Sequence, residues 1–139
     1  MFEVRVQAGP FDLAAEHARL AALPSGPGAI SSFIGLVRDA PLLLEHYPAM
    51  AERELAAILD DARARWPLLG AIVVHRHGLL APAEPIVLVL TAARHRAAAI
   101  DSAAFLIDWL KTRAPFWKKE AGGWVEAHAA DDAAAERWE

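Results

Sequence analysis

The chain of 139 residues contains no cysteine. Disulfide bonds, thiolate nucleophiles, persulfides and cysteine-based metal sites are therefore excluded from its chemistry. If this protein takes part in sulfur chemistry, another molecule must bring the sulfur. The sequence also lacks the G-x-S-x-G, P-loop and G-x-G-x-x-G patterns, so the hydrolytic and nucleotide-binding mechanisms that depend on those patterns have no support.

Long apolar runs are absent as well. No stretch approaches the roughly 18 residues that a membrane span needs, and the N-terminus lacks a basic segment followed by an apolar one. We therefore expect a cytoplasmic protein that does not enter the membrane. The net charge of −4 argues against a protein that coats nucleic acid or an anionic membrane. A hydrophobic fraction of 55% is typical of a globular protein with a buried core.

Lysine is scarce and unevenly placed. Among 14 basic residues there are only three lysines, Lys111, Lys118 and Lys119, and the arginines are scattered along the chain. Composition bias and chance explain any one of these lysines about as well as function does. The clustering favours function, because lysine, unlike arginine, can lose its proton near neutral pH when its surroundings disfavour the charge.

Hydrophobic periodicity predicts a mixed α+β fold. The expected strands are 2–7, 29–37, 42–47, 71–74, 86–90 and 124–127, and the expected helices are 12–23, 48–66 and 95–113, with a helical turn near 131–138. Strand 2–7 alternates like an edge strand, whereas 71–74 and 86–90 are continuous apolar runs, typical of strands covered on both faces. Strand 42–47 is expected beside 29–37, and residues 76–84 are expected to form a loop. No repeat or boundary is visible, so we predict one domain over 1–139.

The longest helix is apolar on two sides. On a helical wheel centred on Ile100, the residues Ala104, Ile107 and Lys111 lie within about 40° of the centre. This spacing predicts that Lys111 continues a buried stripe, although a lysine that reaches water from the helix end would show the same spacing. Phe105 and Trp109 fall nearly opposite. A helix that is buried on two sides in a small domain indicates a subunit interface.

Cationic side chains mark both ends of this helix. Arg94, His95 and Arg96 open it, and free N–H groups at a helix start can bind an anion, although a solvated basic helix start is the commoner explanation. His95 and Lys111 are separated by roughly 24 Å along the helix. They cannot hold one small ligand from the same chain. Either they serve separate purposes, or a dimer brings the start of one helix near the end of the other.

The histidines give a weaker signal. His75 and His77 lie on one face of an expected strand, which would suit a metal pair, but no third histidine or carboxylate stands nearby in the sequence. We therefore predict no metal site. His17, His46 and His128 are interpreted as surface or packing residues.

Several stretches resemble the catalytic (large) subunits of molybdopterin synthase. They are "GAISSFIGLVR", "LEHYPAMAERELAAILDDARARWPL", "HRHG", "ARHRAAAIDSAAFLIDWLKTRAPFWKKE" and "WVEA", of which "LKTRAPFWKKE" is the most specific. The resemblance covers nearly the whole chain and implies an α/β hammerhead fold and a homodimer. It also implies a heterotetramer with a small ubiquitin-like sulfur carrier that ends in Gly-Gly. The implied reaction inserts sulfur from the carrier's thiocarboxylate into cyclic pyranopterin monophosphate, with no permanently bound cofactor.

The resemblance also assigns site residues in this sequence. Lys111 and Lys118 match the family's two catalytic lysines. The implied substrate-binding positions are Leu36, Val37, Arg38, His95, Arg96, Lys111, Lys118, Lys119 and Glu120, with the pocket shared between two large subunits. In this hypothesis the arginines and His95 bind the phosphate, Lys118 exchanges protons, and Lys111 positions the substrate and the carrier's last glycine. Phe116 and Trp117 either wall the pocket or simply pack in the core.

The chain departs from the family pattern after Arg38. The segment 39–44, "DAPLLL", is shorter than is usual in the family, and Arg94 is less typical. A shorter hairpin at this position could change how the substrate is shielded from solvent or how the carrier docks. The alternative hypothesis is therefore a non-catalytic dimeric relative that binds an anion or a carrier protein. A third possibility is an unrelated acyl-transfer enzyme that uses the lysine pair.

Overall fold

The computed structural model describes residues 1–38, 41–46, 48–113, 116–120, 123–125 and 134–138, and it describes 45, 46, 48, 116–120 and 123–125 by their backbone alone. The elements, in chain order, are β1 (Phe2–Gln7), α1 (Leu13–Ala21), β2 (Ala29–Leu36), β3 (Leu42–His46), α2 (Pro48–Arg65), β4 (Leu68–Arg76), β5 (Gly78–Leu80), β6 (Pro85–Ala93), α3 (Arg96–Thr112), β7 (Phe116–Glu120) and β8 (Gly123–Val125). The prediction of a mixed α+β fold is confirmed, and residues 134–136 form the expected helical turn.

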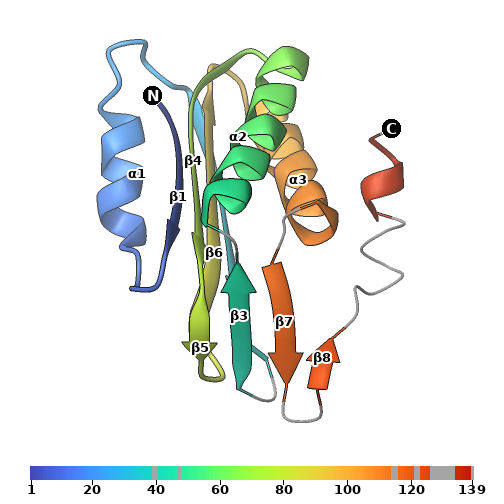
Figure 1. Ribbon diagram of the computed structural model, residues 1–139. Helices are drawn as coiled ribbons and strands as arrows, with labels where there is room; N and C mark the ends of the chain where they lie inside the picture. The colour runs from blue at the N-terminus through green and yellow to red at the C-terminus, as the bar shows by residue number, and fades with distance from the viewer. Residues whose placement is uncertain (39–40, 47, 114–115, 121–122, 126–133, 139) are drawn as a thin grey trace.

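The strands form two four-stranded sheets (Figure 1). The first sheet has the order β1-β4-β6-β2, and the second has the order β5-β3-β7-β8. β1 pairs parallel with β4, while the β4–β6 and β2–β6 pairs are antiparallel. β1 is an edge strand, as its alternating sequence predicts. Helix α1 covers one face of the first sheet, and α2 and α3 cover the other.

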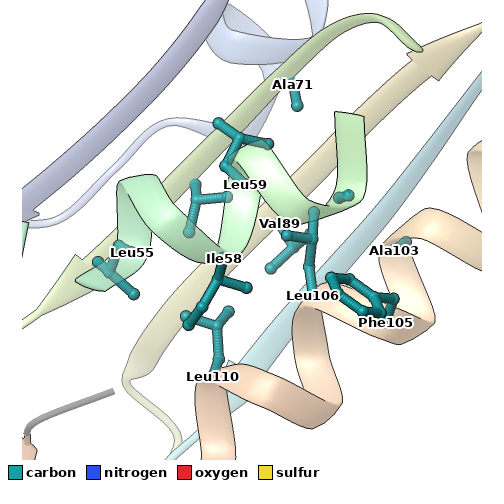
Figure 2. Packing of buried hydrophobic residues seen from close by; sticks show 11 residues of the cluster. Leu55, Ile58, Leu59, Ala71, Val89, Ala103, Phe105, Leu106 and Leu110 are labelled. Carbon is teal, nitrogen blue, oxygen red and sulfur yellow. The ribbon is translucent and has the colours of Figure 1, made fainter. Parts of the chain in front are cut away.

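The central strands supply both cores of the first sheet. Successive side chains of a strand point to opposite faces. Ile72 and Val74 therefore pack with Leu20 on the α1 side, whereas Val73 packs with Phe105 on the side of α2 and α3. Figure 2 shows the larger cluster, in which side chains from α2 and α3 meet above the sheet. The continuous apolar runs thus lie in strands covered on both faces, as predicted.

Two predictions about strands are wrong. β3 does not pair with β2 but lies between β5 and β7 in the second sheet. Its buried residues Leu42 and Leu44 pack with Val37 and Leu80 in a separate small core. Because this packing requires β3 to lie beside β5, β3 does not pair with β2. The expected loop 76–84 contains β5, whose three residues are too few to show a periodic pattern. β7 was not predicted either.

The orientation of α3 also differs from the prediction. Ile100 is 55% exposed and Lys111 is exposed, so these two positions of the predicted buried stripe face outward, whereas Ile107 is half-buried and packs against the core. Phe105, placed on the opposite side, is 1% exposed and belongs to the core. The side that meets the sheet is rich in small residues such as Ala99 and Ala103, which allow the helix to approach closely. Lys111 therefore fits the alternative of a lysine that faces water near the helix end.

The C-terminal turn is held against α2 and α3. The buried carboxylate of Asp108 accepts hydrogen bonds from Arg137 (2.7 Å) and from the indole N–H of Trp138 (2.5 Å). Arg65 donates to the carbonyl of Trp138 (2.5 Å). The ring of Trp138 packs edge-to-face on Trp66, with centroids 5.7 Å apart. Residues 134–138 thus close one side of the aromatic core.

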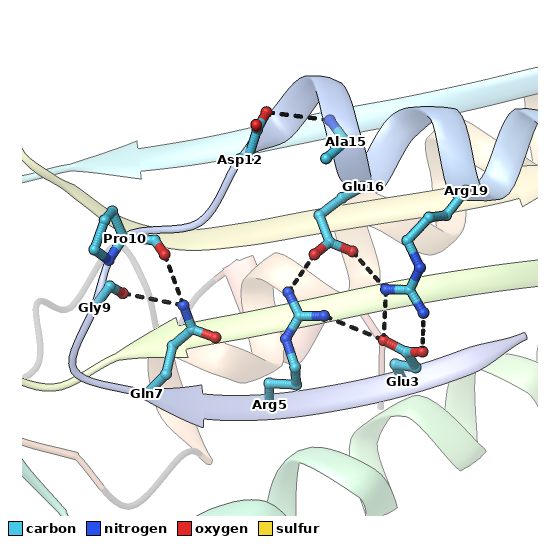
Figure 3. Close-up of polar contacts among 9 residues, drawn as sticks. All are labelled: Glu3, Arg5, Gln7, Gly9, Pro10, Asp12, Ala15, Glu16 and Arg19. Atoms are coloured by element: carbon cyan, nitrogen blue, oxygen red, sulfur yellow. Dashed lines mark hydrogen bonds and ion pairs between the residues drawn. The ribbon is translucent and has the colours of Figure 1, made fainter.

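Four charged side chains connect β1 to α1 (Figure 3). Arg19 pairs with both Glu3 and Glu16, the latter at 2.9 Å, and Arg5 pairs with the same two carboxylates, at 3.2 Å to Glu3. The hydrogen bond from Arg19 holds the pKa of Glu3 below its ordinary value of 4.5. The network therefore favours the ionised form of Glu3 in the folded chain.

This network predicts a dependence of stability on pH. Because the pKa of Glu3 is lower in the folded than in the unfolded chain, its contribution is present above 4.5 and is lost as the pH falls through the lowered pKa. We expect Glu3→Gln to weaken the fall in unfolding free energy between about pH 5 and about pH 3. Urea unfolding of both proteins across this range measures the effect, with the exposed Glu136→Gln as control. Identical pH profiles for wild type and Glu3→Gln would contradict the prediction.

Candidate functional site

Arg38 follows β2 at the junction of the two sheets. The preceding residue, Val37, is 4% exposed and packs with Leu42, Leu44 and Leu80. Arg38 itself is exposed, and Leu36 is 51% exposed. The buried Val37 therefore anchors a short stretch from which a guanidinium group extends into solvent.

The start of α3 has the features of an anion site. His95 is the N-cap residue, with an extended backbone (φ −126°, ψ 150°), and its imidazole makes no capping hydrogen bond. Arg94, His95 and Arg96 are all exposed. Backbone N–H groups and the helix dipole both favour negative charge at this position. The structure thus places three cationic or titratable side chains around a helix N-terminus.

Gly28 lies directly against this helix start. Its N–H donates to the carbonyl of Ala93 (3.0 Å). A Cβ atom at this position would lie 2.2 Å from the carbonyl oxygen of Arg94, which is a backbone atom and cannot rotate away. Only glycine fits here without moving the turn that leads to His95.

The last turn of α3 carries Lys111, which is exposed. Arg113, the C-cap residue, donates to Glu54 (2.8 Å) and to Asp61 (2.9 Å), both on α2. These ion pairs fix the end of α3 against α2. They therefore also fix the backbone from which Lys111 extends and from which the chain continues to β7.

Lys118, Lys119 and Glu120 lie on β7, where the structure describes the backbone. Lys118 is in register with Leu44 on β3 and with Val125 on β8. Lys119 is opposite Leu43 and Trp124, and Glu120 is opposite Gly123. The predicted roles of these residues, and of Phe116 and Trp117, concern side chains, which lie outside the described part of the structure.

The structure divides the predicted residues between the two ends of the first sheet. Leu36 is opposite Pro85 at the start of β6, whereas Ala29 is opposite Ala93 at its end, so Arg38 and His95 lie at opposite ends. α3 runs back along the sheet, which places Lys111 and the start of β7 at the Arg38 end (Figure 1). The length of α3 separates His95 from Lys111 by roughly 24 Å. One chain alone does not bring these two groups together.

A metal centre and a cleft are the two other candidate sites. Among the described residues, no cluster of three or more histidine, aspartate or glutamate side chains suits a metal ion. His75 is buried, with Nδ1 2.8 Å from the carbonyl oxygen of Arg76. A cleft of about 340 Å³ between α2, α3 and the C-terminal turn is lined by none of the predicted site residues. Its two arginines, Arg65 and Arg113, already bind protein groups.

Two contacts beside the predicted residues have no sign in the local sequence. Gly28 stands in a loop with other glycines, and nothing in its neighbours indicates a contact with Arg94. The turn at 81–84 lies in the expected loop, and Pro82 favours a turn there, but nothing in its sequence indicates the hydrogen bonds to Val37. Both contacts join residues far apart in the chain, so local sequence patterns do not report them.

Comparison with known proteins identifies relatives of this chain. A family model described as "MoaE protein" matches residues 6–113. The molybdopterin synthase catalytic subunit of Cereibacter sphaeroides is 55% identical over 144 aligned residues, which cover 97% of this chain and 99% of that protein. The solved molybdopterin biosynthesis MoaE protein of Burkholderia ambifaria has a TM-score of 0.89 and 48% identity, covering 99% of this chain and 98% of that one.

A more distant likeness concerns the fold alone. A chain from the Helicobacter pylori complex of subunits 1 and 2 of molybdopterin-converting factor has a TM-score of 0.73 and 19% identity, and the match covers 91% of this chain and 90% of that one. Across the described ranges, no helix combines the length and the apolar character that crossing a bilayer requires. From the family match and the near full-length similarity, it follows that this chain is a member of the MoaE protein family.

Proposed function

We propose that this protein is the catalytic subunit of a molybdopterin synthase, which transfers sulfur to cyclic pyranopterin monophosphate. The observation that carries the proposal is the 55% identity to a molybdopterin synthase catalytic subunit over nearly the full length of both proteins. The same similarity supports a catalytic function over the alternative of a non-catalytic binding relative. The absence of cysteine fits an enzyme that receives its sulfur from a partner.

In the proposed reaction, the sulfur of a carrier thiocarboxylate attacks a side-chain carbon of the pterin, and the carbon–oxygen bond at that carbon breaks. The oxygen leaves on the phosphate, as the cyclic ester opens, in one transfer, and as water from the carbonyl carbon in the other. The product of this step is a thioester between carrier and pterin. Water then cleaves the thioester, which leaves the sulfur on the pterin and releases the carrier as a carboxylate. A second carrier repeats both steps to complete the dithiolene. Oxyanion charge develops in each step, and a well-placed cationic donor typically contributes roughly 3–4 kcal/mol to its stabilisation.

The pocket of the proposed enzyme is shared between two copies of the chain. Within one chain, α3 holds His95 and Arg96 far from Lys111. Ile100, with 55% exposure, and the half-buried Ala104 give α3 apolar side chains outside the core, and the half-buried Ile107 continues them to the edge of the core. If a second copy covers these side chains with its own α3 in the opposite direction, the start of one helix approaches the end of the other. A homodimer of this kind completes the site.

The proposed roles follow from charge and position. Arg38, His95 and Arg96 bind the substrate phosphate, for which guanidinium groups are well suited. Neighbouring cations favour the neutral form of a lysine, so Lys118 donates and accepts protons in turn. Lys111 positions the substrate and the carrier's last glycine. The backbone at Leu36, Val37, Lys119 and Glu120 completes the pocket.

The proposed assembly contains two copies of this chain and two carriers. Residues 1–139 act as one domain, and each copy binds a small ubiquitin-like carrier that ends in Gly-Gly, which makes a cytoplasmic heterotetramer. The shortened segment 39–44 does not remove any of the matched charged residues. Its residues 42–44 belong to β3, and 39–40 lie outside the described residues.

Incubation of the protein with thiocarboxylated carrier and cyclic pyranopterin monophosphate tests the proposal. We expect a dithiolene product, detected after oxidation to a fluorescent pterin. Size measurement by light scattering at the assay concentration is expected to give a dimer. The absence of product with an intact dimer and bound carrier would instead support the non-catalytic alternative, and a monomer that turns over would refute the shared pocket.

The contact at Gly28 predicts a specific defect. Gly28→Ala places a Cβ 2.2 Å from the Arg94 carbonyl, so the backbone before His95 must move. We expect a loss of about 1–3 kcal/mol in unfolding free energy, and a rise of roughly tenfold in KM for the pterin, equivalent to about 1.4 kcal/mol of binding. Gly9→Ala is the control, because a Cβ there meets no atom within 4 Å. Equal KM values for the two variants would contradict a role of Gly28 in shaping the anion site.

A further inference from the structure

The turn between β5 and β6 is bonded to the end of β2. Val37 donates its N–H to the carbonyl of Glu84 (2.9 Å), and Ala83 donates its N–H to the carbonyl of Val37 (2.8 Å). Both main-chain groups of Val37 are therefore held by residues 81–84. Because Arg38 is the next residue, these two bonds also fix the point from which its side chain begins.

β2 is irregular just before this contact. Gly35 is opposite Val87, but Leu36 is opposite Pro85, so the register with β6 shifts by one residue between Gly35 and Leu36. A bulge of this kind bends a strand and changes the direction of the side chains that follow. A Cβ at Gly35 would lie 2.9 Å from the side chain of Val87, so the close approach favours glycine. The bulge directs Val37 into the small core and is followed by the exposed Arg38.

The turn itself holds an unfavourable backbone conformation. Ala83 has φ 73°, and no other non-glycine residue in the described part of the chain has a positive φ. Residues other than glycine rarely occupy this region. Ala83 is exposed, so packing of its side chain does not explain the conformation. Its N–H is bonded to Val37, and the next residue, Glu84, accepts from Val37, so hydrogen bonds hold the chain on both sides of this conformation. Such conformations persist where surrounding bonds impose them.

The carboxylate of Glu84 connects the turn to its own backbone and to Arg76. Its Oε2 accepts a hydrogen bond from the N–H of Ala81 (2.5 Å), and its Oε1 lies 3.8 Å from the guanidinium of Arg76. Arg76 is 6% exposed and donates to the carbonyls of Pro85 (3.0 Å) and Ala8 (3.0 Å). The turn is thereby connected to the interior of the first sheet.

We propose that the turn at 81–84 positions Arg38 for binding the substrate phosphate, with Ala83 and Glu84 as positioning residues that do not touch the substrate. The inference rests on the function proposed above. An arginine on a loose strand end would lose more conformational freedom on binding than one whose backbone is already held. The bulge, the left-handed Ala83 and the contacts of Glu84 together hold the backbone of Val37 and Arg38.

Valine and glycine at position 83 test this role. Valine disfavours a positive φ, so Ala83→Val should open the bond to Val37, whereas Ala83→Gly accepts the conformation. We expect faster hydrogen exchange at the amide of Val37 in Ala83→Val and the wild-type rate in Ala83→Gly. For the pterin, Ala83→Val should raise KM roughly three- to tenfold with kcat changed less than about twofold. In an Arg38→Ala background, Ala83→Val should add nothing, because it acts through Arg38.

Glu84→Ala is a second variant with the same expected direction, since it removes the acceptor of the Ala81 N–H. The exposed Glu136→Ala is its control. Unchanged exchange at Val37 in both Ala83→Val and Glu84→Ala would overturn the inference, as would an equal rise in KM with and without Arg38. If the wild-type protein forms no product, the proposed function fails instead, and hydrogen exchange still decides whether the turn holds Val37.

Discussion

Replacing Lys118 with alanine is expected to lower product formation by roughly 10²–10³-fold, the usual effect of removing one donor to a developing oxyanion. The proposed reaction needs this donor in both the attack and the hydrolysis steps. Lys118 lies on β7 in register with Leu44 on β3 and Val125 on β8, so its backbone is held by strands on both sides. The measurement is the rate of dithiolene formation with saturating carrier.

Lys118→Arg separates charge from proton transfer. Arginine keeps the positive charge but does not release a proton near neutral pH. If Lys118 acts as a proton donor and acceptor, Lys118→Arg should remain well below wild-type activity. For Lys118→Ala, which removes a positive charge, the control is Arg53→Ala, because it removes an exposed cation from α2. Full activity of Lys118→Ala, with carrier binding and dimerisation intact, would refute the assigned role.

The largest expected effect on stability comes from Phe105→Ala, with a loss of about 3–5 kcal/mol in unfolding free energy. Phe105 is 1% exposed, and its ring meets Trp66, Trp138 and Trp109 edge-to-face at centroid distances of 5.4, 5.7 and 6.4 Å. Its removal leaves a cavity between α2, α3 and the C-terminal turn. Urea unfolding followed by tryptophan fluorescence, at one fixed protein concentration, measures the loss.

Met50→Ala is the matched control for this experiment. Met50 lies on α2 but is 54% exposed, so its truncation should change the unfolding free energy by less than about 0.5 kcal/mol. A loss below about 1 kcal/mol for Phe105→Ala would contradict the packing described for the aromatic cluster. A similar loss in both variants would indicate that the region of Met50 is buried in the assembly.

Local patterns predict those elements whose apolar residues repeat over many positions. The runs around Val73 and Val89 indicate covered strands, and the cap at Asp12, which accepts from the N–H of Ala15 (3.1 Å), marks the start of α1. Short strands carry no such repeat. β5 has three residues, and it forms because Leu80 joins Leu42 and Leu44 in the small core.

The sequence predicts some of the placement of the candidate residues. The helix length alone separates His95 from Lys111, and the structure agrees with that separation. The direction of Lys111 was wrong, because a wheel cannot tell which of two apolar sides of α3 meets the sheet. Gly28 and Ala83 contact the backbone of segments distant in the chain, and these contacts leave no mark in the local sequence.

The sequence by itself determined the mixed α+β class, the three helices, the central strands and the family, since these depend on periodicity and on residue types at short spacing. The tertiary structure decided which face of α3 is buried, which sheet β3 joins and how Arg38 is held. Those outcomes depend on packing and hydrogen bonds between segments far apart in the chain. Their free energies arise only when both partners are in place, so no single stretch of the sequence reveals them.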